Sequence, residues 1–197
     1  MPIKPILFNT EMVLAILDGR KSCTRRLVKF FSGENPRWSG YIKDGLMLYN
    51  GKNEPCIRKA PYQPGDILYV RETFIQAAAH IFWYKANDKP WMSKGLRWKP
   101  SIHMPKEAAR IWLKVTDVRV ERLQDVTEDG AKAEGAIDNR GFIHSPENEY
   151  DRIYTAREHF IKIWNSTIKK SNLNRYGWDA NPWVWVIEFE RCEKPKT

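Results

Sequence analysis

Apolar and polar residues recur along the first part of the chain in a pattern that predicts a strand and then a helix. Residues 3–8 form a short apolar run, and a helical apolar pattern follows at 10–18. Asn9 and Thr10 stand before this helix and Gly19 stands just after it. Asn and Thr commonly cap the first turn of a helix, and glycine commonly ends one. The chain therefore begins with a strand and a capped helix.

Short apolar runs bounded by turn-forming residues recur through the rest of the chain. They predict further strands at 25–31, 67–74, 81–85, 111–120 and 182–190. The run at 67–74 follows a Pro-Gly-Asp turn, and its apolar positions are mostly β-branched or aromatic. The alternation of apolar and polar residues changes phase in the middle of 111–120. The apolar side chains therefore share one face only if a bulge falls there.

Two helices and two long polar stretches complete the pattern. Thr127 caps a short helix that ends at Gly135, and residues 150–168 form the longest helix. Residues 32–62 are rich in turn formers and contain a hairpin signal at Asp44-Gly45, whereas 87–105 is a long loop. We predict a single α+β domain over 1–197, with insertions at about 32–62 and 87–105. Its sheet has about six or seven strands, closed or nearly closed, with about three peripheral helices.

Composition favours a cytoplasmic protein with an anionic partner. The 197 residues carry 33 Lys+Arg against 24 Asp+Glu, a formal net charge of +9. Such a surplus favours nucleic acid as a partner, and the nine tryptophans offer flat faces for stacking bases. Three distant cysteines indicate neither a disulfide framework nor a zinc site. No apolar run approaches the ~20 residues of a membrane helix. We expect no cofactor and no metal.

The residues that could carry out chemistry lie in the basic turn, residues 19–26, which follows the first helix. Lys21 and Thr24 lie in this turn, and Glu72 lies near the end of the predicted strand 67–74. An amine, a hydroxyl and a carboxylate can carry out acyl transfer without a metal, because a lysine of lowered pKa can activate a threonine hydroxyl. Residues three apart point to opposite faces of a regular strand, so Lys21 and Thr24 converge only if 20–23 is a turn.

These residues resemble the motifs of a known family. The pattern Gly19-x-Lys21-x-x-Thr24-Arg25-Arg26, after a strand and a short helix, is similar to the signature of the ASCH domain. Pro-Gly-Asp at 64–66 and Val-Arg-Glu at 70–72 are similar to a second block of that domain. The resemblance covers about 3–29 and 62–74, and extends more weakly over 110–123 and 183–191.

The resemblance implies both a fold and an activity. ASCH domains are related to PUA domains, which are small β-barrels that bind RNA. Some small bacterial ASCH proteins are amidohydrolases that remove the acyl group of N4-acetylcytidine, and their catalytic lysine, threonine and glutamate correspond to Lys21, Thr24 and Glu72. This chain is about twice as long as those enzymes. Its ending, Trp-Asp-x-Asn-Pro-Trp-Val-Trp-Val, resembles longer ASCH proteins met among phage and prophage proteins.

Two main functions follow from these residues. The first is a metal-free amidohydrolase acting on an N4-acylated cytidine, cytosine or related amide. The alternative is a binding module for RNA or a modified nucleoside, in which Lys21 contacts phosphate and Thr24 contacts a base edge. Without a catalytic role, Glu72 is expected to form a salt bridge with Lys21 or Arg26. A third possibility is a phage accessory protein without this chemistry. Substrate contacts are expected from Arg20, Arg25, Arg26, Arg71, Phe74, Trp98 and His103.

Overall fold

The computed structural model describes residues 2–31, 41–43, 47–49, 52, 54–89, 95–139 and 154–195. These residues form two compact units. Unit 1 comprises Met1–Arg20, Gln63–Thr116 and Phe189–Thr197, and unit 2 comprises Lys21–Tyr62 and Asp117–Glu188. We describe each unit by itself.

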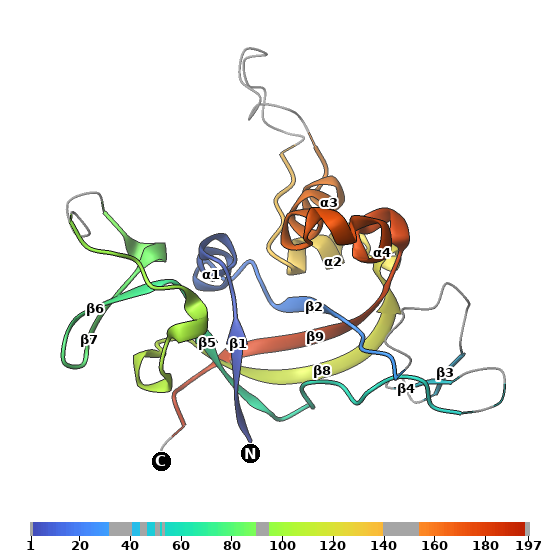
Figure 1. The fold of residues 1–197 in the computed structure, drawn as a ribbon, viewed down its shortest axis with the longest axis horizontal. Coiled ribbons are helices and arrows are strands. Elements are labelled where there is room, and N and C mark those ends of the chain that lie inside the picture. Colours follow the sequence, from blue (N-terminus) through green and yellow to red (C-terminus); the bar gives the residue numbers. More distant parts are fainter. Residues whose placement is uncertain are drawn as a thin grey trace, which may run out of the picture. The chain divides into compact units, whose positions relative to one another are not determined.

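The main sheet has five strands in the order β1-β5-β8-β9-β2 (Figure 1). Their bounds are β1 Ile3–Leu7, β5 Ile67–Arg71, β8 Trp112–Arg122, β9 Trp183–Cys192 and β2 Cys23–Leu27. β1 pairs with β5 in parallel, whereas β5–β8 and β2–β9 are antiparallel pairs. The mixed sheet and the separate helices confirm the α+β class. Among the described residues, no strand pairing closes this sheet into a barrel.

Unit 1 contains the predicted first helix and a hairpin. Helix α1, Thr10–Leu17, is capped by the Asn9 side chain, which accepts a hydrogen bond from the Met12 N–H, and Gly19 follows at a φ of 75°. β6 (Phe74–Ala78) and β7 (Ile81–Tyr84) form an antiparallel ribbon. The buried core of unit 1 gathers around Ile67, Phe74, Met104, Ala108, Ala109 and Trp112.

Unit 2 places its helices against one face of β2 and β9. They are α2 (Glu128–Ala133), α3 (Ala156–Thr167) and the short α4 (Leu173–Tyr176), which Figure 1 shows side by side. Their shared core contains Cys23, Leu123, Val126, Ala131, Ala136, Ala156, Phe160, Trp164, Val184 and Val186. A small ribbon, β3 (Tyr41–Lys43) with β4 (Met47–Tyr49), confirms the predicted hairpin, although its turn lies outside the described residues.

Several boundaries differ from the sequence prediction for local physical reasons. The longest helix begins at Ala156, because Thr155 and Glu158 form a capping box there, and residues 150–153 lie outside the described part. The strand expected over 67–74 ends at Arg71, and Phe74 starts the next strand, β6. β2 begins two residues earlier than the predicted strand 25–31 and ends at Leu27.

Short 3-10 helices join the longer elements of the described residues, and one of them, Ser101–His103, lies within the predicted loop 87–105. Their bounds are η1 Lys85–Asn87, η2 Ser101–His103, η3 Lys106–Ala108, η4 Leu123–Asp125, η6 Lys170–Asn172 and η7 Trp178–Ala180. Within the described residues, no helix is both long and apolar enough to cross a membrane.

Candidate functional site

The segment after α1 is tied to the end of α2 within unit 2. Lys21 forms an isolated antiparallel bridge with Glu134, and the Ser22 N–H donates to the Ala133 carbonyl at 2.8 Å. Glu134 is the C-cap residue of α2, and Gly135 follows at a φ of 91°. The basic turn is therefore held in place by a helix that lies more than a hundred residues later in the sequence.

The Lys21 ammonium has an acceptor for each of its three hydrogens. Nζ donates to Glu134 Oε2 at 2.7 Å, to the Glu134 carbonyl at 2.8 Å and to the Cys23 carbonyl at 2.8 Å. The Lys21 side chain is 1% exposed and that of Glu134 is 8% exposed. A buried ammonium requires such compensation, because removing a charge from water is costly.

Arg25 joins the same buried cluster. Its guanidinium lies 3.4 Å from Glu134 Oε1 and 3.5 Å from Glu121 Oε2, and its Cζ lies 5.7 Å from the centre of the Phe160 ring. Its Nε is buried without a hydrogen-bond partner among the described residues. Glu134 thus forms ion pairs with two cations, Lys21 and Arg25. Arg25, which we predicted as a substrate contact, is a buried member of this ion-pair cluster.

Cys23 and Thr24 lie at the start of β2. Cys23 belongs to the core beneath the helices, and burial, followed by the nearby Glu134 carboxylate, raises the pKa of its thiol to about 12. Thr24 is also buried and is paired with Ile187 of β9. Side chains alternate along a strand, so the Thr24 hydroxyl lies on the face of β2 opposite to Cys23 and Arg25.

Glu72 is buried within unit 1 and bound by an arginine that the sequence analysis did not select. Arg110 Nε donates to Glu72 Oε1 at 2.8 Å, and Arg110 Nη2 donates to Oε2 at 2.9 Å. This two-point geometry is the strongest kind of arginine–carboxylate contact. The guanidinium also lies 4.1 Å from the centre of the Tyr84 ring and donates to Asn87 Oδ1 at 3.1 Å.

A small cavity of unit 1 lies beside this ion pair. It has a volume of about 130 Å³ and is lined by Phe82, Trp83, Tyr84, Asn87, Asp88, Trp98 and Arg110. Two predicted substrate contacts are at or near it. Trp98 lines the cavity and Lys85 Nζ lies 4.9 Å from the centre of its ring, whereas Phe74 is buried and packs against Phe82.

The remaining predicted contacts have diverse environments. In unit 1, Arg20 is exposed and pairs with Asp18 at 3.0 Å, Arg71 donates to the Ile102 carbonyl, and His103 is exposed in η2. In unit 2, Arg26 is half-buried and paired with Trp185 of β9. Trp91, another stacking candidate, lies outside the described residues.

The structure thus brings Lys21 together with Arg25 through Glu134, and Glu72 together with Arg110. Lys21 and Thr24 belong to unit 2 and Glu72 to unit 1, so the three predicted catalytic residues are described in two separate settings. In the described part of the chain, no group of three acidic, histidine or cysteine side chains could hold a metal ion.

Comparisons with known proteins add little to this geometry. No protein-family model matches the chain, and no curated protein matches it by sequence. Among solved structures, the crystal structure of the hypothetical protein PH0355 is matched over 98% of this chain and 100% of that chain, at 16% identity and a TM-score of 0.38.

Proposed function

We propose that the protein is an amidohydrolase that removes an acyl group from N4-acylated cytidine, cytosine or a related amide. The observation that carries the proposal is the burial of all three expected catalytic residues. Lys21, Thr24 and Glu72 are 4%, 4% and 1% exposed. Few polar side chains of the described residues are so buried, and because burying such groups costs free energy, perturbed buried groups of this kind cluster at functional sites. The resemblance to ASCH amidohydrolases assigns the same three residues.

The proposed reaction is acyl transfer to Thr24 followed by hydrolysis. The Thr24 hydroxyl oxygen attacks the acyl carbon, and its proton passes to the Lys21 amine. The carbon–nitrogen bond then breaks as the Glu72 carboxylate passes this proton from the Lys21 ammonium to the exocyclic nitrogen of the base. Water cleaves the resulting ester to release the carboxylic acid. The proposal includes a PUA-like barrel, the fold that the resemblance to ASCH domains implies.

Glu134 adds a residue to this scheme. Lys21 accepts a proton only as a neutral amine, and a hydrogen-bonded ammonium must first lose one. The Glu134 carboxylate, 2.7 Å from Nζ, is placed to take that proton. Glu134 therefore acts on Lys21 rather than on the substrate in this proposal.

Release of cytidine from N4-acetylcytidine by the purified protein tests the proposal. We expect turnover by the wild type and its loss in Lys21→Ala. Lys21→Met retains more of the buried packing and serves as the second variant, and Lys132→Ala, an exposed lysine of α2, is the matched control. Absence of turnover with a panel of acylated cytidines, or full activity in both Lys21 variants, would refute it.

A specific observation favours the alternative function, a module that binds RNA or a modified nucleoside. The charges of Lys21 and Glu72 are compensated within the protein by Glu134 and Arg110, as expected for a structural frame. Phosphate contacts then come from exposed cations such as Arg20. Binding through phosphates weakens steeply with salt, whereas turnover of a neutral nucleoside does not. A steep salt dependence without turnover would select the binding function.

A further inference from the structure

The small cavity of unit 1 that Arg110 lines has mainly aromatic walls. Four of its seven lining residues are aromatic, namely Phe82, Trp83 and Tyr84 of β7 and Trp98 of the loop that follows. All four are half-buried, so each keeps some surface exposed. Aromatic walls of this kind favour planar ligands, because the faces of flat rings stack on one another.

The volume of the cavity limits the ligand to a single ring. The cavity measures about 130 Å³, and an apolar cavity of about 150 Å³ takes one benzene molecule. A pyrimidine base is one six-membered ring and matches this size, whereas a purine carries a second fused ring. Asn87 at the edge of the cavity is exposed, so the sugar of a nucleoside can remain in solvent.

The ion pairs around the cavity disfavour an anionic ligand. The Arg110 guanidinium is bound at two points by Glu72, at 2.8 and 2.9 Å. Lys85 Nζ pairs with the Asp88 carboxylate at 3.1 Å. An anion would therefore have to displace a carboxylate that each cation already holds.

The same two cations disfavour a cationic ligand. Arg110 Cζ lies 4.1 Å from the centre of the Tyr84 ring, and Lys85 Nζ lies 4.9 Å from the centre of the Trp98 ring. A cation in the cavity would be repelled by both and would compete with them for the ring faces. The lining is thus suited to an uncharged ring.

Asn87 supplies a hydrogen-bond donor to such a ring. Its Oδ1 accepts from Arg110 Nη2 at 3.1 Å, which leaves the amide nitrogen as the donor that Asn87 offers at the cavity. Cytosine and uracil both carry an acceptor carbonyl at ring position 2. We propose that the cavity binds the pyrimidine ring of a nucleoside, stacked on Trp98 and with its 2-carbonyl on the Asn87 amide.

This site also bears on the proposed reaction. Arg110 lines the cavity and binds Glu72, the residue that passes the proton to the base in that scheme. The assignment of this ring to the substrate rests on the proposed function, whereas the binding of a pyrimidine does not. The same ring occurs in a free nucleoside and in single-stranded RNA, and the experiment distinguishes these two sources.

Calorimetric titration with cytidine, uridine, adenosine and guanosine tests the site. The two pyrimidine nucleosides should bind about 10-fold more tightly than the purines, because a second ring overfills the cavity. Cytidine affinity should be the same at about 50 and 200 mM salt, because the ligand is uncharged. A short oligocytidylate that binds more tightly and with steep salt dependence identifies RNA as the source. Equal affinity identifies the free nucleoside.

Variants link the binding to the cavity. Trp98→Ala should weaken cytidine binding about 10-fold or more through loss of stacking, and Trp98→Phe should retain most of the affinity. Asn87→Asp replaces the donor by a carboxylate of the same shape and should weaken binding about 10-fold. Because Asn87 is exposed, this variant keeps the test valid if Trp98→Ala fails to fold.

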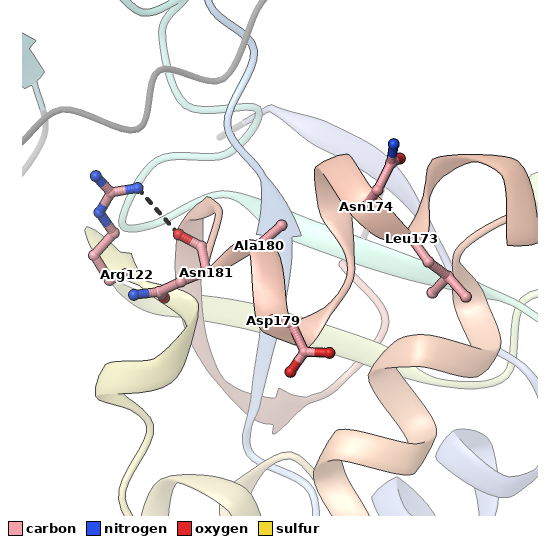
Figure 2. Close-up of a pocket in the computed structure, with 6 residues that line it drawn as sticks. All are labelled: Arg122, Leu173, Asn174, Asp179, Ala180 and Asn181. Carbon is pink, nitrogen blue, oxygen red and sulfur yellow. Dashed lines mark hydrogen bonds between the residues drawn. The ribbon is translucent and has the colours of Figure 1, made fainter.

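A larger cavity of unit 2 provides the control. It has a volume of about 560 Å³ and is lined by Arg122, Leu173, Asn174, Asp179, Ala180 and Asn181 (Figure 2). That volume admits purines as readily as pyrimidines. Asn174→Asp, the same change at an exposed asparagine of this second cavity, should leave cytidine binding unaltered.

The outcomes separate this proposal from the proposed function. The site is refuted if neither pyrimidine nucleoside binds, if purines bind equally well, if Asn174→Asp abolishes binding, or if Trp98→Ala and Asn87→Asp both bind normally. Turnover of N4-acetylcytidine with an unchanged KM in both cavity variants would remove the site from the reaction and leave the amidohydrolase standing. Cytidine binding that depends on Trp98 and Asn87, without turnover of any acylated cytidine, would support the site and refute the amidohydrolase.

Discussion

Removing the charge of Glu134 should destabilise the protein more than any surface charge change. In Glu134→Gln, Lys21 and Arg25 keep their positive charges, but both lose the carboxylate that binds them. Their side chains are 1% and 3% exposed, and that of Glu134 is 8% exposed, so water does little to replace the lost contacts. Breaking a buried ion pair on one side costs about 3–5 kcal/mol.

This cost is large compared with the stability of a typical protein. Unfolding free energies are about 5–15 kcal/mol, and in a chain of this size 1 kcal/mol lowers the melting temperature by about 2–4 °C. We therefore expect the melting temperature of Glu134→Gln to fall by about 6–20 °C. Urea unfolding followed by tryptophan fluorescence should give a matching loss of unfolding free energy.

The control is an ion pair of the same type at the surface. Arg20 and Asp18 are 3.0 Å apart, with side chains 42% and 55% exposed. Exposed pairs contribute little, so Asp18→Asn should cost less than about 1 kcal/mol. If Glu134→Gln is no more destabilising than Asp18→Asn, the cluster does not hold unit 2 together and our account of it is incorrect.

Three further predictions concern local features. Cys23 should resist alkylation by iodoacetamide at about pH 8.5, because burial raises the pKa of its thiol to about 12. Half-buried Cys56, whose pKa burial raises less, should react faster, and comparable rates in the native protein would contradict this. Thr155→Ala should lower the unfolding free energy by about 1 kcal/mol through loss of the α3 capping box, and an unchanged urea midpoint would argue against that cap. Gly19→Ala should lower the unfolding free energy by about 1–2 kcal/mol, because φ is 75°, a conformation that residues with a side chain rarely adopt. No atom lies within 4 Å of the added methyl, so the cost comes from the backbone alone, and a neutral effect would show that the turn adopts another conformation.

Local patterns were sufficient to predict most of the strands and helices. Asn9 caps α1, Gly19 takes a left-handed conformation after it, and the apolar run 182–190 corresponds to β9. Each depends on residues close together in the sequence. The start of α3 was missed because the capping box at Thr155 is a short polar signal within a longer apolar pattern.

The partners of the candidate residues could not be predicted in the same way. Glu134 lies 113 residues after Lys21, and Arg110 lies 38 residues after Glu72. No spacing or local pattern links such residues, because the tertiary fold alone brings them together. The sequence was therefore sufficient to predict Lys21 and Glu72 as candidate catalytic residues, but not to identify the groups that compensate their charges.

The most direct test of the proposed function is the initial rate of cytidine release from N4-acetylcytidine by the wild type, Thr24→Ser and Thr24→Ala. We predict turnover by the wild type, a reduced rate in Thr24→Ser, and a loss of about 10³-fold or more in Thr24→Ala, because the attacking oxygen is absent. A wild-type protein that releases no cytidine, or a Thr24→Ala variant as active as the wild type, would contradict the account.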